Sequence, residues 1–231
     1  MTSAAGRLTG IFLAGVFGAL MLPLPAQAEC GDQPAPGVNW TGCSKEKLIL
    51  QRSDMTGGIF ENAFLSGTNL GGATLAGANL QRSELVRSSF VQADLSKANF
   101  EKSLASRADF AGAKLGGARL VKAEFLRVSF VGADLTDADL SDGDFYRNDF
   151  SGAQMTGANL QDAIMPRTVF AGAKLEGANF AGAFLLRTRF DKTDLSGVKD
   201  LEQAQLDQAC GDAETVLPAG LTAPAGWPCP E

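Results

Sequence analysis

Residues 107–130 read RADFAGAKLGGARLVKAEFLRVSF, and they show clearly the periodicity from which the fold is predicted. Every fifth residue from Phe110 to Phe130 is Phe or Leu, and the residue two places earlier is Ala or, at the last place, Val128. A spacing of five matches neither an α-helix, with about 3.6 residues per turn, nor the alternation of a β-strand. It predicts short extended segments, each of which turns one large and one small side chain inward before the chain bends.

The same two columns of side chains run through most of the chain. From Leu50 to Leu195 every fifth residue is large and apolar except Ala105, and from Ser53 to Thr193 the residue two places earlier is mostly Ala. Extended segments that stack coil upon coil pair their backbones with the coils above and below. The pattern therefore predicts an all-β solenoid, in which each coil buries its inner side chains against its neighbours.

A second, longer period gives the length of one coil. An arginine recurs every 20 residues, and a phenylalanine stands three residues after each one. These residues are Arg87, Arg107, Arg127, Arg147, Arg167 and Arg187, followed by Phe90, Phe110, Phe130, Phe150, Phe170 and Phe190, which we expect to form a core ladder. Four five-residue segments per period predict a coil with four sides. We expect the repeat array to cover residues 48–199. Leu195 lies 145 positions after Leu50, which at 20 residues per coil gives about seven coils, and at about 4.8 Å per coil the rod is about 35 Å long.

These repeats give the chain a resemblance to the pentapeptide-repeat family, whose pattern is close to A(D/N)LXX. The resemblance covers about residues 48–206, and matching stretches are Ala93-Asp94-Leu95, Ala98-Asn99-Phe100, Ala133-Asp134-Leu135, Ala138-Asp139-Leu140 and Ala158-Asn159-Leu160. It implies a right-handed quadrilateral β-helix without enzymatic activity. The best-understood relatives are cytoplasmic, acidic, dimeric proteins that mimic DNA and shield type II topoisomerases.

The segments on either side of the array predict two caps, which a solenoid needs because its end coils would otherwise present open edges. Residues 29–47 contain two cysteines, prolines and Trp40, and are expected to form the N-terminal cap. Residues 200–231 are expected to form the C-terminal cap, beginning with a short helix that Asp200 caps and Gln203 supports. The apolar tail after this helix is expected to fold back over three outward apolar residues, Ile164, Phe184 and Leu186.

The four cysteines lie in pairs near the two ends of the array. Sequence alone allows three pairings. A rod would hold its two ends much farther apart than the Cα limit of about 7 Å for a disulfide. We therefore predict Cys30–Cys43 and Cys210–Cys229, each of which would hold one cap together.

Residues 1–28 have the features of a secretory signal peptide. Arg7 precedes an apolar stretch from Ile11 to Leu22, and Ala26-Gln27-Ala28 resembles a cleavage site. The apolar stretch, about 12 residues, is too short to cross a bilayer as a helix. We expect an exported protein, periplasmic or extracellular, without stable membrane insertion after cleavage; the alternative is an anchor that stays uncleaved.

Composition narrows the chemistry that the chain can perform. The 231 residues include no histidine, which excludes Ser-His and Cys-His catalysis and most zinc sites. A formal net charge of −6 argues against binding nucleic acid through a large basic surface. The outward side chains of a square rod form no concave site for acid–base catalysis. We expect no enzymatic activity and no cofactor.

An acidic cluster between residues 134 and 149 invites a comparison with calcium sites. Its spacing does not match the loop of an EF-hand or a calcium β-roll. Adding one coil to Lys114, Arg119 and Lys122 gives Asp134, Asp139 and Asp142. We therefore expect ion pairs between successive coils there, each worth less than about 1 kcal/mol, and no metal site.

The six arginines that recur every 20 residues, called the Arg ladder below, are the candidate partner-binding surface. Like charges about 5 Å apart repel by roughly 0.8 kcal/mol per pair even in water. The preceding column includes Leu126 and Tyr146, and planar guanidinium groups beside apolar side chains suit a carboxylate-rich protein or an anionic polymer. The alternative is a structural stripe, neutralised in part by nearby acids: Glu84, Asp109, Glu124, Asp144 and Asp149.

The sequence favours a non-enzymatic exported scaffold that binds a protein or an anionic partner through the Arg ladder. One alternative is a DNA mimic that acts on topoisomerases, which needs a cytoplasmic location and a mainly negative face. The other is a purely structural rod without a dedicated ligand. A homodimer is compatible with each of these functions, and we expect no nucleic-acid partner.

Overall fold

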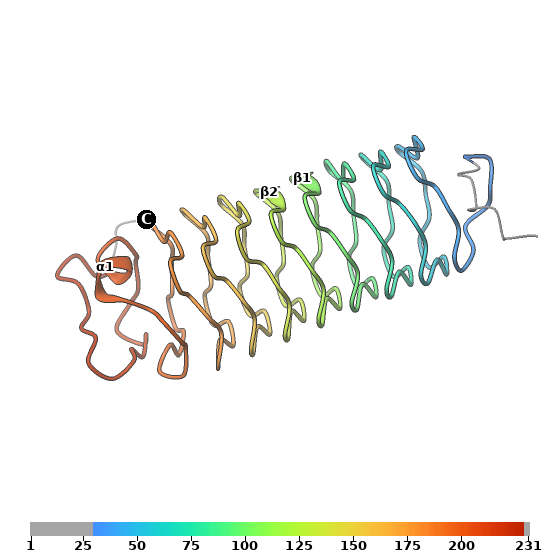
Figure 1. The fold of residues 1–231 in the computed structure, drawn as a ribbon. Helices are drawn as coiled ribbons and strands as arrows, with labels where there is room; N and C mark the ends of the chain where they lie inside the picture. Colours follow the sequence, from blue (N-terminus) through green and yellow to red (C-terminus); the bar gives the residue numbers. More distant parts are fainter. Residues whose placement is uncertain (1–29, 229–231) are drawn as a thin grey trace, which may run out of the picture.

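Parallel β-bridges join residues that lie 20 positions apart along most of the chain. Four ladders of such bridges, beginning at Asn39, Ser44, Ile49 and Asp54, run along four sides. The computed structural model describes residues 30–228, in which the coils stack into an elongated rod (Figure 1). The coil length and the four sides agree with the 20-residue spacing of the Arg ladder.

Regular strands are short in this fold. Two three-residue strands, β1 (Leu104–Ser106) and β2 (Glu124–Leu126), pair in parallel on successive coils. The other sides pair through a single bridge each, because only one outward residue separates the two inward residues before the next corner. The backbone is nevertheless bonded between coils throughout, as in the Phe130 N–H to Asp149 carbonyl bond of 2.7 Å.

Side chains from the two inward columns fill the coil. The six phenylalanines of the predicted core ladder are all fully buried. Their rings stack on one another, with centroids 4.6 Å apart between Phe90 and Phe110 and 5.4 Å apart between Phe170 and Phe190. Since burying one such side chain contributes roughly 1.5–3 kcal/mol, this column is a main source of stability.

Each corner of the coil needs a residue in the left-handed region. Gly112 has φ +64° and Arg107 has φ +56° at equivalent corners. At most corners the next N–H donates to the carbonyl three residues earlier, as in Ala63 to Phe60 at 3.0 Å, which is the pattern of a type II turn. Glycine adopts this conformation freely, whereas other residues lose about 1–2 kcal/mol.

At the N-terminal end the regular ladder begins at Asn39, before the predicted start of the array at residue 48. Trp40 and Lys45 occupy the large inward column in place of Leu or Phe, and both are buried. The Lys45 Nζ donates a 2.7 Å hydrogen bond to the Cys30 carbonyl and lies 3.9 Å from the centre of the Trp40 ring. The Lys45 ammonium group thus covers the open end of the first coil, a role that the five-residue pattern does not predict.

One predicted disulfide, Cys30–Cys43, is confirmed, with its Cα atoms 5.4 Å apart. Cys210 is also disulfide-bonded. Its predicted partner Cys229 lies outside the described residues, as does the predicted signal peptide at residues 1–28. Within the described part of the chain, no helix has the length and apolar character needed to cross a membrane.

The C-terminal cap contains α1 (Gln203–Leu206), a single turn of helix. The predicted capping residues are wrong: Glu202, not Asp200, is the N-cap, and the Gln205 side chain accepts the Glu202 N–H at 2.7 Å. Asp200 is instead left-handed, with φ +54°. The physical reason is the core, because this start places Leu206 at a fully buried position on the end of the rod.

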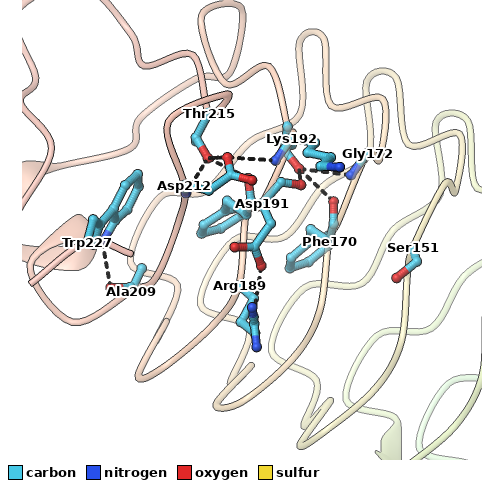
Figure 2. Close-up of polar contacts among 12 residues, drawn as sticks. Ser151, Phe170, Gly172, Arg189, Asp191, Lys192, Ala209, Asp212, Thr215 and Trp227 are labelled. Carbon is cyan, nitrogen blue, oxygen red and sulfur yellow. Dashed lines mark hydrogen bonds and ion pairs between the residues drawn. The ribbon is translucent and has the colours of Figure 1, made fainter. Parts of the chain in front are cut away.

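The tail after α1 covers the end of the rod and not its side. The Trp227 Nε1 donates to the Ala209 carbonyl at 2.9 Å (Figure 2). Trp227 also packs against the core, as do Leu217 and Leu221. The last coil has no further coil to cover it, so the apolar tail packs against it instead. The expected covering of the side is therefore wrong, and these residues stay exposed: Ile164, Phe184 and Leu186.

Candidate docking face

The Arg ladder lies along one corner of the rod. Its six arginines are exposed and occupy the left-handed corner position, with φ between 55° and 58°. Their backbone N–H groups bond to the next coil, as in Arg127 to the Tyr146 carbonyl at 2.9 Å. The backbone therefore holds the arginines at a fixed spacing, while the guanidinium groups are free to face solvent.

A shallow groove of about 350 Å³ follows the ladder. It is lined by two adjacent corner columns: Val86, Ser106, Leu126 and Tyr146 in one, and Arg87, Arg107 and Arg127 in the other. The small Ser106 stands between Val86 and Leu126 on successive coils, so the groove has apolar walls on either side of it. Both apolar residues that the sequence assigned to the partner surface, Leu126 and Tyr146, line this groove.

Exposed apolar side chains also occupy the side of the rod that leads into this corner. Phe64, Leu104, Ile164 and Phe184 share one position of the coil and are each 42–46% exposed. Phe64 and Leu104 were not among the partner-binding residues that the sequence predicted. Reading that outward column at a spacing of 20 would have found them. The docking face comprises the Arg ladder, the groove and these four apolar side chains, which share their column with Glu84, Glu124 and Asp144.

The ladder guanidinium groups form no ion pair with the residues that the structure describes. The cations that do form ion pairs in residues 30–228 are others: Arg82, Lys102, Arg119, Arg189 and Lys192. The Arg147 guanidinium lies 5.2 Å from the centre of the Tyr146 ring. The ladder is therefore not neutralised by direct ion pairs with the acids that were expected to flank it.

Those acids accept hydrogen bonds from other groups. Asp109, Asp144 and Asp149 each accept the backbone N–H of the residue two places later, at 2.9–3.1 Å. Glu84 accepts the Ser66 hydroxyl at 3.1 Å. These carboxylates stabilise corners of the coil and remain on the sides next to the ladder.

The acidic cluster has the expected register between coils. Bridges join Lys114 to Asp134 and Arg119 to Asp139. Arg119 and Asp139 form an ion pair of 3.7 Å, whereas the two other expected pairs are not among the ion pairs of the described residues. Asp134 and Asp139 also accept the N–H of the residue two places later, at 3.0 and 3.2 Å. In residues 30–228 no group of three or more His, Cys, Asp or Glu side chains could hold a metal ion.

Comparison with known families agrees with this architecture. The family model for pentapeptide repeats matches residues 49–83, 65–101, 106–142 and 168–210, with 8 copies, and these matches cover more than half of the chain. The chain belongs to the pentapeptide repeat family. Proteins of this family are generally non-enzymatic and act in structure or interaction.

The solved structure of QnrB1 has a similar fold. QnrB1, described as a plasmid-mediated fluoroquinolone resistance protein, is 16% identical with a TM-score of 0.54, over 79% of this chain and 90% of that chain. HetL from the cyanobacterium Nostoc, described as involved in heterocyst differentiation regulation, is 24% identical over 72% and 90%, with a TM-score of 0.28. A pentapeptide repeat protein from the Arabidopsis thaliana thylakoid lumen is 34% identical over 48% and 66%, with a TM-score of 0.23. Comparison with curated protein sequences gives no significant match.

Proposed function

We propose that this pentapeptide repeat protein is an exported, non-enzymatic scaffold that binds a protein or another anionic partner through the docking face. The observation that carries the proposal is the Arg ladder itself. Its exposed arginines lack ion pairs with the described residues and occupy corners where glycine would relieve about 1–2 kcal/mol of backbone strain. Stacking them about 4.8 Å apart adds repulsion. A partner that presents carboxylates would remove that repulsion.

Export is the second part of the proposal. The Cys30–Cys43 disulfide supports it, because disulfides persist in oxidising compartments and are rare in the cytoplasm. The secretory features of residues 1–28 point the same way. The chain would then meet its partner in the periplasm or outside the cell.

A crosslinking pull-down from the exported fraction tests the proposal. The ladder variant changes four corner arginines to glycine: Arg107, Arg127, Arg147 and Arg167. Glycine suits the left-handed corner, so this variant should fold as well as the wild type. The charge-matched control makes the same change at four left-handed corners of other columns: Arg82, Lys97, Lys102 and Lys122.

We expect the wild type and the control to capture the same partner and the ladder variant to lose it. Equal capture by all three proteins would overturn the docking face. Finding the wild type in the cytoplasm would overturn export and would reopen the DNA-mimic alternative. At present that alternative has less support, because it needs a mainly negative face and because the likeness to QnrB1, at 16% identity, concerns the fold alone.

A further inference from the structure

The positive surface of the docking face is one side chain wide. Carboxylates border the ladder on both adjoining sides of the rod, with Glu84, Glu124 and Asp144 before the corner and Asp109 and Asp149 after it. A broad polyanion, such as a nucleic-acid duplex or an anionic bilayer, would bring its charge against these carboxylates. The surface therefore suits a narrow ligand that carries a single line of negative charge.

The spacing of the ladder selects the conformation of such a ligand. Successive arginines are about 4.8 Å apart along the rod, as neighbouring β-strands are. One turn of an α-helix rises about 5.4 Å, so over three coils the turns of a helix move out of register with the ladder by about 2 Å. Arginine side chains are long enough to bridge this offset. In an extended strand, side chains on one face recur about every 6.7 Å. Over three coils they move out of register with the ladder by about 6 Å, which is more than the spacing between two successive arginines.

The groove beside the ladder supplies a second requirement. Val86, Leu126 and Tyr146 lie one residue before the ladder positions, so an apolar strip runs parallel to the charged strip. A helix with acidic residues on one stripe and apolar residues on the next meets both strips, with anchors spaced three or four residues apart. Six arginines span about 24 Å, which corresponds to about 16 helical residues.

We infer that the docking face binds an acidic amphipathic α-helix that lies parallel to the axis of the rod. This inference rests on the proposed function and names the partner's chemistry. The carboxylates of the helix contact the Arg ladder, and its apolar stripe fills the groove around Ser106. The backbone of the coils does not need to rearrange, because the bonds between coils fix the spacing of the ladder before the partner arrives.

Three synthetic peptides of about 16–18 residues test this inference. The first carries Glu and Leu on adjacent stripes of a helix. The second has the same composition in scrambled order, and the third is the first peptide with two central prolines, which prevent the helix. Each is titrated into the wild type, the ladder variant and the charge-matched control. The readout is the NMR signal of Tyr146, which lines the groove and is the one tyrosine in the sequence.

We expect the helical peptide to shift the Tyr146 signal and to bind the wild type and the control at least tenfold more tightly than the other two peptides. Its affinity for the ladder variant should fall by about tenfold for each arginine that contacts it.

Equal binding of the proline peptide, or tighter ladder-dependent binding of duplex DNA, would overturn the inference that the partner is a helix. The proposed function would survive both results if the pull-down still depended on the ladder. Loss of ladder dependence in both experiments would overturn both.

Discussion

At many corners an Asp or Asn side chain acts as the acceptor that closes the local turn. Asp94 Oδ1 accepts the Ser96 N–H at 3.1 Å, and Asn99 Oδ1 accepts the Glu101 N–H at 3.0 Å. Both residues satisfy a backbone donor two places ahead, which is the geometry of an Asx turn. The fold needs the oxygen and not the charge. The acidic character of these positions is therefore separable from their structural role.

This separation predicts a pH dependence. The pKa of Asp94 lies below its ordinary value of 3.8, chiefly because the Ser96 hydroxyl donates to the carboxylate. Burial opposes this effect and is next in size, and the Ser96 N–H and the charge of Lys114 lower the pKa further. A lowered pKa in the folded state means that the carboxylate stabilises the fold above its unfolded pKa and stops doing so as the pH falls through the folded value. Asp94→Asn should therefore lose less stability between pH 7 and pH 3, measured by urea unfolding, than the wild type loses.

The reciprocal change provides the control. Asn99→Asp places a carboxylate in the equivalent turn of the next segment and should increase the stability lost on acidification. Equal acid sensitivity of Asp94→Asn and the wild type would show that the charge of this turn does not contribute.

At the scale of one coil, the stacked rings decide stability. The Phe130 ring lies between those of Phe110 and Phe150, with centroid distances of 5.1 and 4.8 Å. Leu126 stands on the same coil but points outward and is 36% exposed. Two residues four positions apart thus differ in environment because one belongs to an inward column and the other to a corner.

Truncating these two side chains should give very different results. Phe130→Ala leaves a cavity in the ring stack and should lower the free energy of unfolding by about 3–5 kcal/mol. Leu126→Ala removes a corner side chain and should lower it by less than about 1 kcal/mol. Urea unfolding measures both. Similar losses for the two variants would contradict the assignment of inward and outward columns.

The repeats predicted the coil well because every coil places its large and small inward side chains at the same five-residue spacing. The periods of five and twenty gave the coil and the column of buried phenylalanines. The ends depend on contacts that no period contains: the Lys45 ammonium closes the first coil through the Cys30 carbonyl, and the apolar tail covers the last coil. At the docking face, the 20-residue period predicted the arginines and their apolar neighbours, whereas their left-handed backbone and the groove became visible only in the structure.

At the scale of the whole molecule, each coil contacts only its neighbours, so stability varies along the rod. The first coil has a neighbour on one side only. Lys45 and the Cys30–Cys43 disulfide compensate for the missing coil. Closing a loop of this size contributes about 3 kcal/mol in the chain-entropy model. Loss of a single bond should therefore destabilise the N-terminal coil more than the coils in the middle of the rod.

Cys30→Ser tests this gradient, because it removes the bond while leaving the buried Cys43 in place. Hydrogen exchange of the Trp40 amide, which bonds to the Ile59 carbonyl at 2.7 Å, should accelerate. Exchange of the Phe130 amide in the middle of the rod should remain unchanged. A similar acceleration at both amides would show that the rod unfolds as one cooperative unit.

The equivalence of successive coils has a genetic consequence. Because residues 20 positions apart occupy the same place on successive coils, an in-frame duplication or deletion of one coil leaves every inward column in register. Such an event changes only the length of the rod and the number of ladder arginines. A lineage could therefore strengthen or weaken partner affinity in discrete steps by recombination between its own repeats, without any new point mutation.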